Sequence, residues 1–386
     1  MSCPYLAGRK LGRIATTVCA LSRNDRLVFQ VAKFFFIASI LQFMEEQTMK
    51  TIGIVSLSAG TLGEPFVAHE LAIGTKRLES MGCKVKFLPN ALKGIAYLKA
   101  HPEKRAQDLL EAYRDPEIDM ILCAIGGDDT YRLLPYLFGE DELKKVASKK
   151  TFLGFSDTTV NHFMLHKLGI PTFYGQSFLA DVCELEENML PYTEKYFREL
   201  LQTGTIQEVR PSDTWYEERT DFGADQVGVP RVKHPNEGFQ LLQGCPQFEG
   251  EILGGCVDTM FDFFDGSRYP DMPELCRRYE LFPQDWQGKI LLLESCEEKM
   301  KPEKYRKALE FLKEAGVLAA VNGILVGKPM DEAYLQEYHA ILREVVADPN
   351  KPILANLNIG HATPRCILPF GVKARVDAEE QAIYFG

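Results

Sequence analysis

The chain has 386 residues, of which 46% are hydrophobic and 25% charged, and its formal net charge at pH 7 is -10. These fractions are typical of a soluble globular protein, and the length predicts two domains rather than one core. An acidic chain lacks the basic face that displaces counterions from nucleic acid, so the charge argues against duplex binding and favours small-molecule substrates.

The ten cysteines form neither a metal-binding nor a disulfide pattern. No C-x-x-C spacing occurs, and no cysteine pair lies near two histidines at zinc-finger spacing. Cys83, Cys123 and Cys256 lie in apolar runs or beside glycines, where a reduced thiol behaves as a small hydrophobic group. The cysteines therefore predict a reducing, cytoplasmic location.

The first 48 residues differ from the rest of the chain. The apolar run 31–43 is too short to span a bilayer and is interrupted by Lys33. Two glutamates follow it, at 45 and 46, where a secretory signal would have small residues. We expect the ordered protein to start near Met49. Residues 1–48 would then be a mis-called start or a disordered extension, with a membrane anchor as the less favoured alternative.

From Met49 onward, strand patterns alternate with helix patterns. The predicted strands cover 51–56, 83–89, 119–125, 151–155 and 171–174, and the predicted helices cover 65–81, 103–113, 129–137 and 158–168. Such alternation predicts an α/β domain over residues 49–202, with a doubly wound, flavodoxin- or Rossmann-like parallel sheet. Its functional groups are expected at the carboxyl ends of the strands.

The periodicity fails between residues 203 and 238, which are rich in proline, glycine and acidic residues. This composition predicts a long linker loop, and such loops are usually functional or connect domains. A second, mixed α/β domain is expected over 239–386. Its predicted strands cover 251–253, 289–294, 323–327, 353–355, 372–379 and 382–386, and its predicted helices start at 257, 302 and 334.

Ser156 is the candidate nucleophile. It lies in the sequence GFSDT, where a predicted buried strand ends and a helix begins. At such a turn a serine is exposed at the edge of the sheet, and the next backbone N–H, that of Asp157, can face a developing oxyanion. The sequence lacks the second glycine of G-x-S-x-G. A serine that only caps the helix is the alternative.

The sequence IGGDD follows the neighbouring predicted strand. Its two glycines allow a close backbone approach, so the N–H of Gly127 could lie beside Ser156. Asp128, next in the chain, is a further candidate for contacting substrate. A plain turn is the alternative. Neither a dinucleotide-binding G-x-G-x-x-G nor a phosphate-binding P-loop motif occurs.

His361 is the best candidate for a catalytic base. It lies in a loop bounded by glycine and proline, just after a predicted strand. A surface histidine is the alternative. His162 and His166 are spaced as two metal ligands on a helix, but the glutamate of H-E-x-x-H and an evident third ligand are lacking, so no metal is expected.

Glu294 closes the apolar strand KILLLE and is the candidate partner of that histidine. A partly buried acid needs a hydrogen-bonding partner, and a carboxylate can fix the tautomer of an imidazole. A solvated strand end is the alternative, and Glu297 and Glu298 lie close enough to compete for the role. The order serine, glutamate, histidine is one of the known chain orders of a catalytic triad.

Six segments, taken together, resemble the LD-carboxypeptidase family of serine peptidases, and within it most closely the microcin C self-immunity branch. These are GGDDTYRLLPYL, GFSDTT, FYGQ, EGEILGGCVDTM, ILLLESCEE and NIGHATPR, which follow one another in the family's order. The similarity as a whole runs from about Met49 to the end. Residues 1–48 have no counterpart in the family. Where many relatives have asparagine, this chain has Cys256.

The resemblance implies a two-domain homodimeric enzyme whose carboxyl-terminal domain supplies the glutamate and the histidine across a cleft. It assigns Ser156 as nucleophile, Glu294 and His361 as its partners, and the N–H groups of Gly127 and Asp157 as the oxyanion hole. No cofactor and no metal are required.

The resemblance leaves the substrate open. Trp215 resembles the loop tryptophan that stacks on the nucleotide of a peptidyl-adenylate in the immunity branch, although it could instead anchor its loop. Other family members remove a terminal D-amino acid from cell-wall tetrapeptides. A third alternative is a small-molecule binding protein without catalysis, in which Ser156 only caps a helix.

Overall fold

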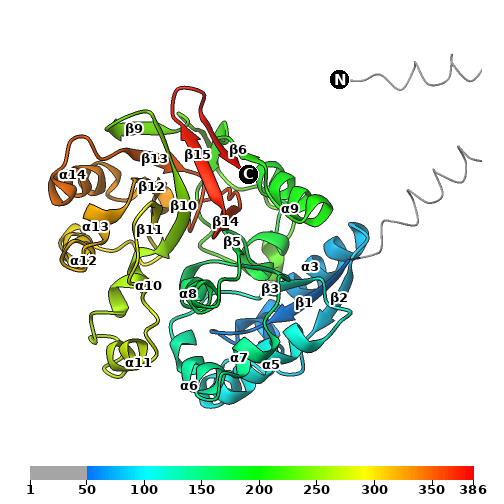
Figure 1. Cartoon of the computed structure of the whole chain (residues 1–386). Helices are drawn as coiled ribbons and strands as arrows, with labels where there is room; N and C mark the ends of the chain where they lie inside the picture. Colours follow the sequence, from blue (N-terminus) through cyan, green and yellow to red (C-terminus); the bar gives the residue numbers. More distant parts are fainter. Residues whose placement is uncertain (1–49) are drawn as a thin grey trace, which may run out of the picture. The chain divides into compact units, whose positions relative to one another are not determined.

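The structure is a computed structural model that describes residues 50–386. The predictions for residues 1–48, including the apolar run 31–43, lie outside the described residues. Between Lys50 and Gly386 the chain forms one compact unit that contains two large sheets (Figure 1). None of the helices in this part combines the length and the apolar character that crossing a membrane requires.

The first sheet has six strands in the order β14-β5-β4-β3-β1-β2. The strands are β1 (Thr51–Val55), β2 (Lys84–Phe87), β3 (Met120–Cys123), β4 (Thr151–Gly154), β5 (Thr172–Tyr174) and β14 (Leu368–Phe370). β1 to β5 are parallel, and they alternate with α3 (Ala68–Ser80), α5 (Pro102–Arg114) and α8 (Thr159–Lys167) among others. The prediction of a mostly parallel amino-terminal sheet is confirmed.

Strand β14 was not predicted. It comes from the carboxyl-terminal part of the chain, yet it pairs antiparallel with β5 of the first sheet. Pro369 lies in its middle, opposite Phe173, and proline argues against a strand because it cannot donate a ladder hydrogen bond. The conflict is resolved by position, since an edge strand leaves one side of its backbone unpaired.

The second sheet has eight strands in the order β6-β16-β15-β10-β11-β12-β13-β9. The strands are β6 (Glu208–Val209), β9 (Gln240–Gln243), β10 (Gln247–Cys256), β11 (Lys289–Glu294), β12 (Gly323–Gly327), β13 (Ile353–Leu357), β15 (Lys373–Asp377) and β16 (Ala382–Phe385). β10 to β13 are parallel and the outer strands antiparallel. Helices α12 (Pro302–Glu314) and α14 (Leu335–Val346) pack on each other, which confirms a mixed α/β second half.

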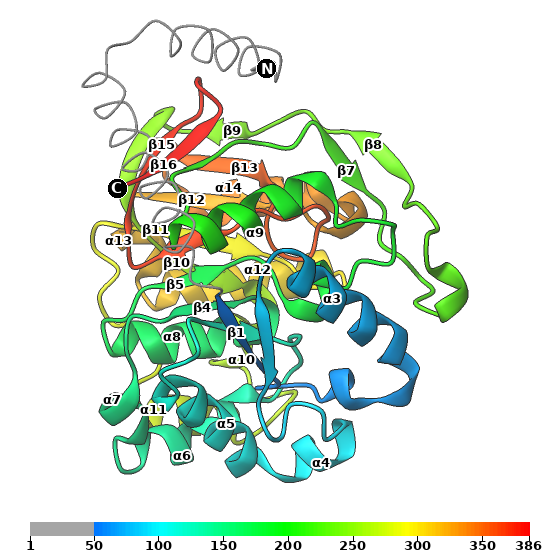
Figure 2. The same ribbon diagram turned by 90° about the vertical axis from the view of Figure 1, so that its right-hand side faces the viewer.

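Residues 203–238 are more structured than the predicted loop. They contain β7 (Thr214–Tyr216) and β8 (Lys233–Pro235), which form a separate two-stranded sheet. β7 is also tied to the loop that follows β13, through a hydrogen bond from Tyr216 N to Thr363 O of 2.9 Å. Figure 2 shows β7 and β8 side by side at the upper right of the molecule. Helix α9 (Pro191–Thr203), which ends where this segment begins, was not predicted. The segment therefore shapes the region around the site rather than only connecting the two halves.

Candidate active site

Ser156 occupies the turn between β4 and α8. Its φ is 66°, a left-handed conformation that is costly for a residue with a side chain. It opens a short 3-10 turn, Ser156–Thr158, that continues into α8. Gly126 lies against it, because a Cβ on Gly126 would come within 2.7 Å of Ser156 Oγ. The predicted sharp strand-to-helix turn is thus present, and the neighbouring glycine loop leaves room for the hydroxyl group.

His361 and Glu294 form a hydrogen-bonded row with Ser156. His361 Nε2 lies 3.0 Å from Ser156 Oγ, and His361 Nδ1 lies 2.7 Å from Glu294 Oε2. The Glu294 side chain is fully buried at the end of β11, whereas Ser156 belongs to the other sheet. The structure therefore brings together three residues that were selected from separate motifs.

Two glycines make room for the buried glutamate. Gly360 has φ 81°, and a Cβ there would lie 2.3 Å from Glu294 Oε2. A Cβ on Gly327 would lie 2.8 Å from Glu294 Cβ. The loop that carries His361 can therefore lie directly over the carboxylate because residue 360 is a glycine.

Tyr174, at the end of β5, joins the two halves of the site. Its hydroxyl donates to Glu294 Oε1 at 2.5 Å and accepts from the backbone N–H of Ser156 at 3.2 Å. This tyrosine lies in the segment FYGQ, and no role was predicted for it. The available signal was its position at a strand end beside the strand of the nucleophile.

Arg365 holds the histidine loop in place. Its guanidinium group donates to the carbonyl oxygens of Gly360 and His361 and pairs with Asp181 at 3.1 Å. Asp181 lies in the turn after β5, so this arginine fixes the loop against the first half of the molecule. Sequence reasoning did not identify the arginine, because both partners depend on the tertiary fold.

The backbone around Gly127 and Asp157 is braced from behind. Gly127 has φ 150°, and a Cβ there would lie 2.2 Å from Ser58 Oγ. The Asp157 side chain accepts hydrogen bonds from Ser58 Oγ at 2.5 Å and from Thr130 N at 2.9 Å. Burial raises the pKa of Asp157 to about 6. Its carboxyl group thus serves as a brace, which leaves only its backbone N–H as a candidate for the oxyanion hole.

Glu297, one of the two acids expected to compete with Glu294, contacts the other ring nitrogen of the histidine, the one that also faces Ser156. Its Oε2 lies 3.1 Å from His361 Nε2, and its side chain is 63% exposed. Burial alone would lower the pKa of His361, but the charge and hydrogen bond of Glu294, with Glu297 adding to them, raise it. Glu298 instead pairs with Arg268 at 2.9 Å.

Glu297→Gln should move the acidic limb of the pH profile of kcat/KM toward lower pH. A general base must be unprotonated, and an adjacent carboxylate stabilises the imidazolium, so removing that charge lowers the pKa of His361. We expect a shift of about one pH unit, measured on any turned-over substrate. Glu298→Gln is the matched control and should leave the limb in place. An unchanged limb in Glu297→Gln would show that this glutamate does not influence the base.

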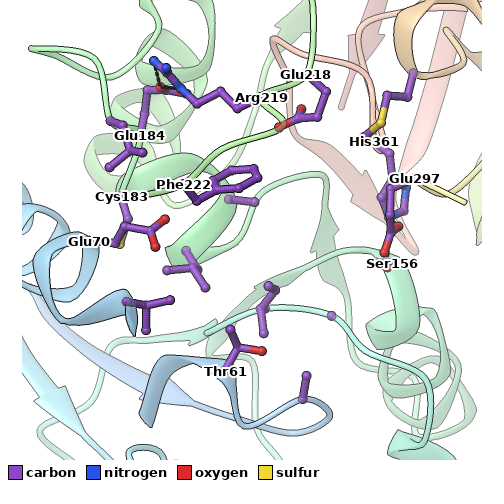
Figure 3. Close-up of a pocket in the computed structure, with 18 of the residues that line it drawn as sticks. Thr61, Glu70, Ser156, Cys183, Glu184, Glu218, Arg219, Phe222, Glu297 and His361 are labelled. Carbon is purple, nitrogen blue, oxygen red and sulfur yellow. Dashed lines mark hydrogen bonds and ion pairs between the residues drawn. The ribbon is translucent and has the colours of Figure 1, made fainter. Parts of the chain in front are cut away.

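The nucleophile and the histidine border a cavity of about 670 Å³ (Figure 3). Gly126 and Gly127 line it, whereas Asp128 and Trp215 are not among its lining residues. Asp128 is exposed at the end of the glycine loop. The Trp215 ring stacks on His234, with centroids 4.4 Å apart, and Lys328 Nζ lies 5.3 Å from its centroid. The cavity therefore contacts the proposed oxyanion loop but neither of the two candidate substrate contacts.

The histidine pair on α8 does not form an open metal site. The ring nitrogens of His162 lie 2.7 Å from Thr172 Oγ1 and 3.1 Å from Gly154 O, and burial lowers its pKa to about 3. One group in residues 50–386 has metal-ligand atoms within 4.8 Å of one another, namely Cys256, Glu294 and His361. Two of these three are already hydrogen-bonded to each other in the row described above.

Serine hydrolases on several unrelated folds share this row of contacts from serine through histidine to a carboxylate. The geometry of the site is therefore that of a serine hydrolase. Comparison with known families is more specific. The model of the LD-carboxypeptidase N-terminal domain matches residues 52–175, and that of the LD-carboxypeptidase C-terminal domain matches residues 249–376. The chain belongs to the LD-carboxypeptidase family of serine peptidases.

Similar proteins come from both branches considered above. An MccF-like protein from Streptococcus pneumoniae, solved in complex with AMP, is 61% identical, with 88% of this chain and 99% of that chain covered and a TM-score of 0.87. The microcin C7 self-immunity protein MccF of Escherichia coli is 27% identical, with 73% of this chain and 77% of that protein covered. A probable murein peptide carboxypeptidase of Bacillus subtilis is 27% identical, with 79% and 83% covered.

Proposed function

We propose that the protein hydrolyses an amide bond at or near the carboxyl terminus of a small peptide or of a peptidyl- or aminoacyl-nucleotide, through an acyl-enzyme. The observation that carries the proposal is the row of contacts from Ser156 Oγ through the imidazole of His361 to the buried Glu294. This row borders a cavity that can admit a small-molecule substrate.

In the first half of the reaction, His361 Nε2 takes the proton of Ser156 as the serine oxygen attacks the scissile carbonyl carbon. Glu294 accepts from Nδ1–H and stabilises the imidazolium that forms. The backbone N–H groups of Gly127 and Asp157 are proposed to hold the oxyanion. The imidazolium then returns its proton to the leaving nitrogen, the C–N bond breaks, and the acyl group remains on the serine.

In the second half, the imidazole takes a proton from water while the water oxygen attacks the acyl carbon. The tetrahedral species collapses with release of the carboxylate, and the proton returns to Ser156 Oγ. Each step of this proposed reaction uses groups of this chain and water alone.

The nucleotide form of the substrate is favoured by the MccF-like protein from Streptococcus pneumoniae, which was solved in complex with AMP and is 61% identical. Trp215 is proposed to stack on the base. Support comes from its position on β7, because the next residue, Tyr216, bonds to the loop that carries His361. A nucleotide on this side would require the stack of Trp215 on His234 to open.

The substrate test compares an aminoacyl sulfamoyl adenosine with a muropeptide tetrapeptide, each incubated with the pure protein. We expect release of the amino acid from the first, with a rise in KM of about tenfold in Trp215→Ala, the size expected for losing one base–aromatic stack. Trp215→Phe keeps a ring and should give an intermediate KM. Release of a terminal D-amino acid from the tetrapeptide, with no reaction of the nucleotide, would favour the cell-wall alternative instead.

The homodimer and the cytoplasmic location implied earlier remain predictions. Turnover that depends on Ser156 would also reject the third alternative, a binding protein in which this serine only caps a helix.

A further inference from the structure

A single carboxyl group stands without a partner at the far end of the cavity. Glu70, on α3, is 5% exposed and lines the cavity. In Figure 3 it lies on the opposite side of the open space from Ser156 and His361, and its carboxyl group faces that space. Within residues 50–386 its side chain makes no hydrogen bond and no ion pair. Its carboxyl oxygens are not among the fully buried polar atoms of the described residues, so they remain accessible from the cavity.

The cations near this carboxyl group are already occupied. Arg219 and Arg231 both pair with Glu184, at 3.1 Å and 2.8 Å. Arg77, on the same helix as Glu70, donates to the carbonyl oxygens that follow β5, including that of Val182 at 2.9 Å. The described part of the chain therefore leaves this acid open toward the cavity.

The walls beside Glu70 are mostly apolar. Phe66, Val67, Leu179, Leu185 and Phe222 line the cavity with it. In Figure 3 the ring of Phe222 projects into the same open space as the glutamate. Its segment is fixed to α3, because His69 Nε2 lies 3.0 Å from Phe222 O. A flat or apolar body would fit between these walls, with one polar group at its end directed at the carboxyl group.

We infer that Glu70 is a specificity residue that binds an amino group of the substrate remote from the scissile bond, carried on a flat or apolar part of the molecule. The inference rests on the proposed function, since the cavity begins at the nucleophile. Two sources share this chemistry: the exocyclic amino group of adenine, which would place the base at Glu70 instead of on Trp215, and the terminal amine of a long side chain in the acyl part. An α-amino group lies too close to the scissile carbonyl to reach across the cavity.

The protonation of the Glu70 carboxyl group agrees with the binding of an amino group. Burial, with the charge of Glu184 adding to it, raises the pKa of Glu70 to about 7. Near neutral pH the group can accept a hydrogen bond as a carboxylate or donate one as an acid. A bound ammonium group would favour the carboxylate, and the acceptor–donor edge of adenine would pair with the acid.

The test measures binding, by calorimetry, of two probe pairs that each differ by one amino group. The first pair is AMP and purine riboside 5′-monophosphate. The second is lysyl and norleucyl sulfamoyl adenosine, bound to Ser156→Ala so that no turnover occurs. With Glu70 present, the amino-bearing member of one pair should bind roughly ten- to a hundredfold more tightly. Glu70→Leu should reduce the ratio of the two dissociation constants within that pair to about one.

Glu79→Leu is the matched control, because Glu79 is an exposed acid on the same helix, and the ratio should remain as in the unmodified chain. Melting curves establish that each variant is folded. If Glu70→Leu changes the ratio of dissociation constants in the first pair, the group bound by Glu70 is the adenine amino group. If it changes the ratio in the second pair, the group is a side-chain amine. Ratios that Glu70→Leu leaves unchanged in both pairs, or no binding of any probe, overturn the inference. A chain that binds with these ratios but hydrolyses neither substrate class overturns only the proposed function.

Discussion

Ser156→Ala is expected to reduce kcat/KM by a factor on the order of 10⁴ to 10⁶, the range found when a nucleophile is removed from a serine hydrolase. Among the described residues, two side chains lie within hydrogen-bonding distance of His361 Nε2, those of Ser156 and Glu297. Glu297 carries no hydroxyl group that the histidine could activate, so the variant has no replacement for the serine nucleophile. The measurement is the initial rate of amino-acid release under saturating and subsaturating substrate.

Stability provides the control for this variant. Ser156 has φ 66°, so alanine bears the same left-handed strain as serine, whereas glycine relieves it. Ser156→Ala should therefore unfold at nearly the temperature of the unmodified protein, and Ser156→Gly should be more stable by about 1 kcal/mol while equally inactive. Turnover above about 10% of the unmodified rate in Ser156→Ala would rule out this serine as the nucleophile.

Glu294→Gln is expected to reduce kcat by a factor of about 10³ to 10⁴. Both carboxylate oxygens now accept hydrogen bonds, from Tyr174 and from His361 Nδ1. A glutamine must turn its NH₂ group toward one of these two donors. The result is either a histidine in the wrong tautomer or a buried tyrosine O–H that has lost the carboxylate as its acceptor.

Comparison with Glu297→Gln distinguishes the role of the buried Glu294 from that of the exposed Glu297. At its own optimal pH this second variant should retain most of its turnover, whereas Glu294→Gln should have lost it at every pH. Equal losses in the two variants would mean that the histidine is oriented by the local negative charge rather than by the 2.7 Å contact to Glu294.

The parts of the fold that could be predicted are those whose burial is visible in local sequence. β1, β3, β11 and β12 are buried parallel strands, and such strands are continuous apolar runs. Ser156 and Glu294 could be proposed because each stands where such a run ends. Their convergence with His361 was implied by the resemblance to the family, because Ser156 belongs to one sheet and Glu294 to the other, and no contact between the sheets is visible in the sequence.

The residues that escaped prediction depend on partners far away in the chain. Tyr174 acts through Glu294, 120 residues later, and Arg365 acts through Asp181, 184 residues earlier. Glu70 is noticeable because the folded protein gives it no partner, and a pattern of residues cannot show a missing contact. β14 was hidden by Pro369, whose effect depends on whether the strand is central or at an edge.

The position of β14 bears on how the molecule could be divided. The family models suggest a cut between residues 175 and 249, yet the first fragment would then lack β14, and the side of β5 that faces away from β4 would be unpaired. Bare edges of this kind recruit strands from other chains and promote aggregation. Phe370 of β14 also stacks on Tyr174, with ring centroids 5.2 Å apart, so the same cut would loosen the tyrosine that supports the nucleophile. The two matched segments are thus interlocked parts of one molecule rather than modules that can be exchanged or expressed separately.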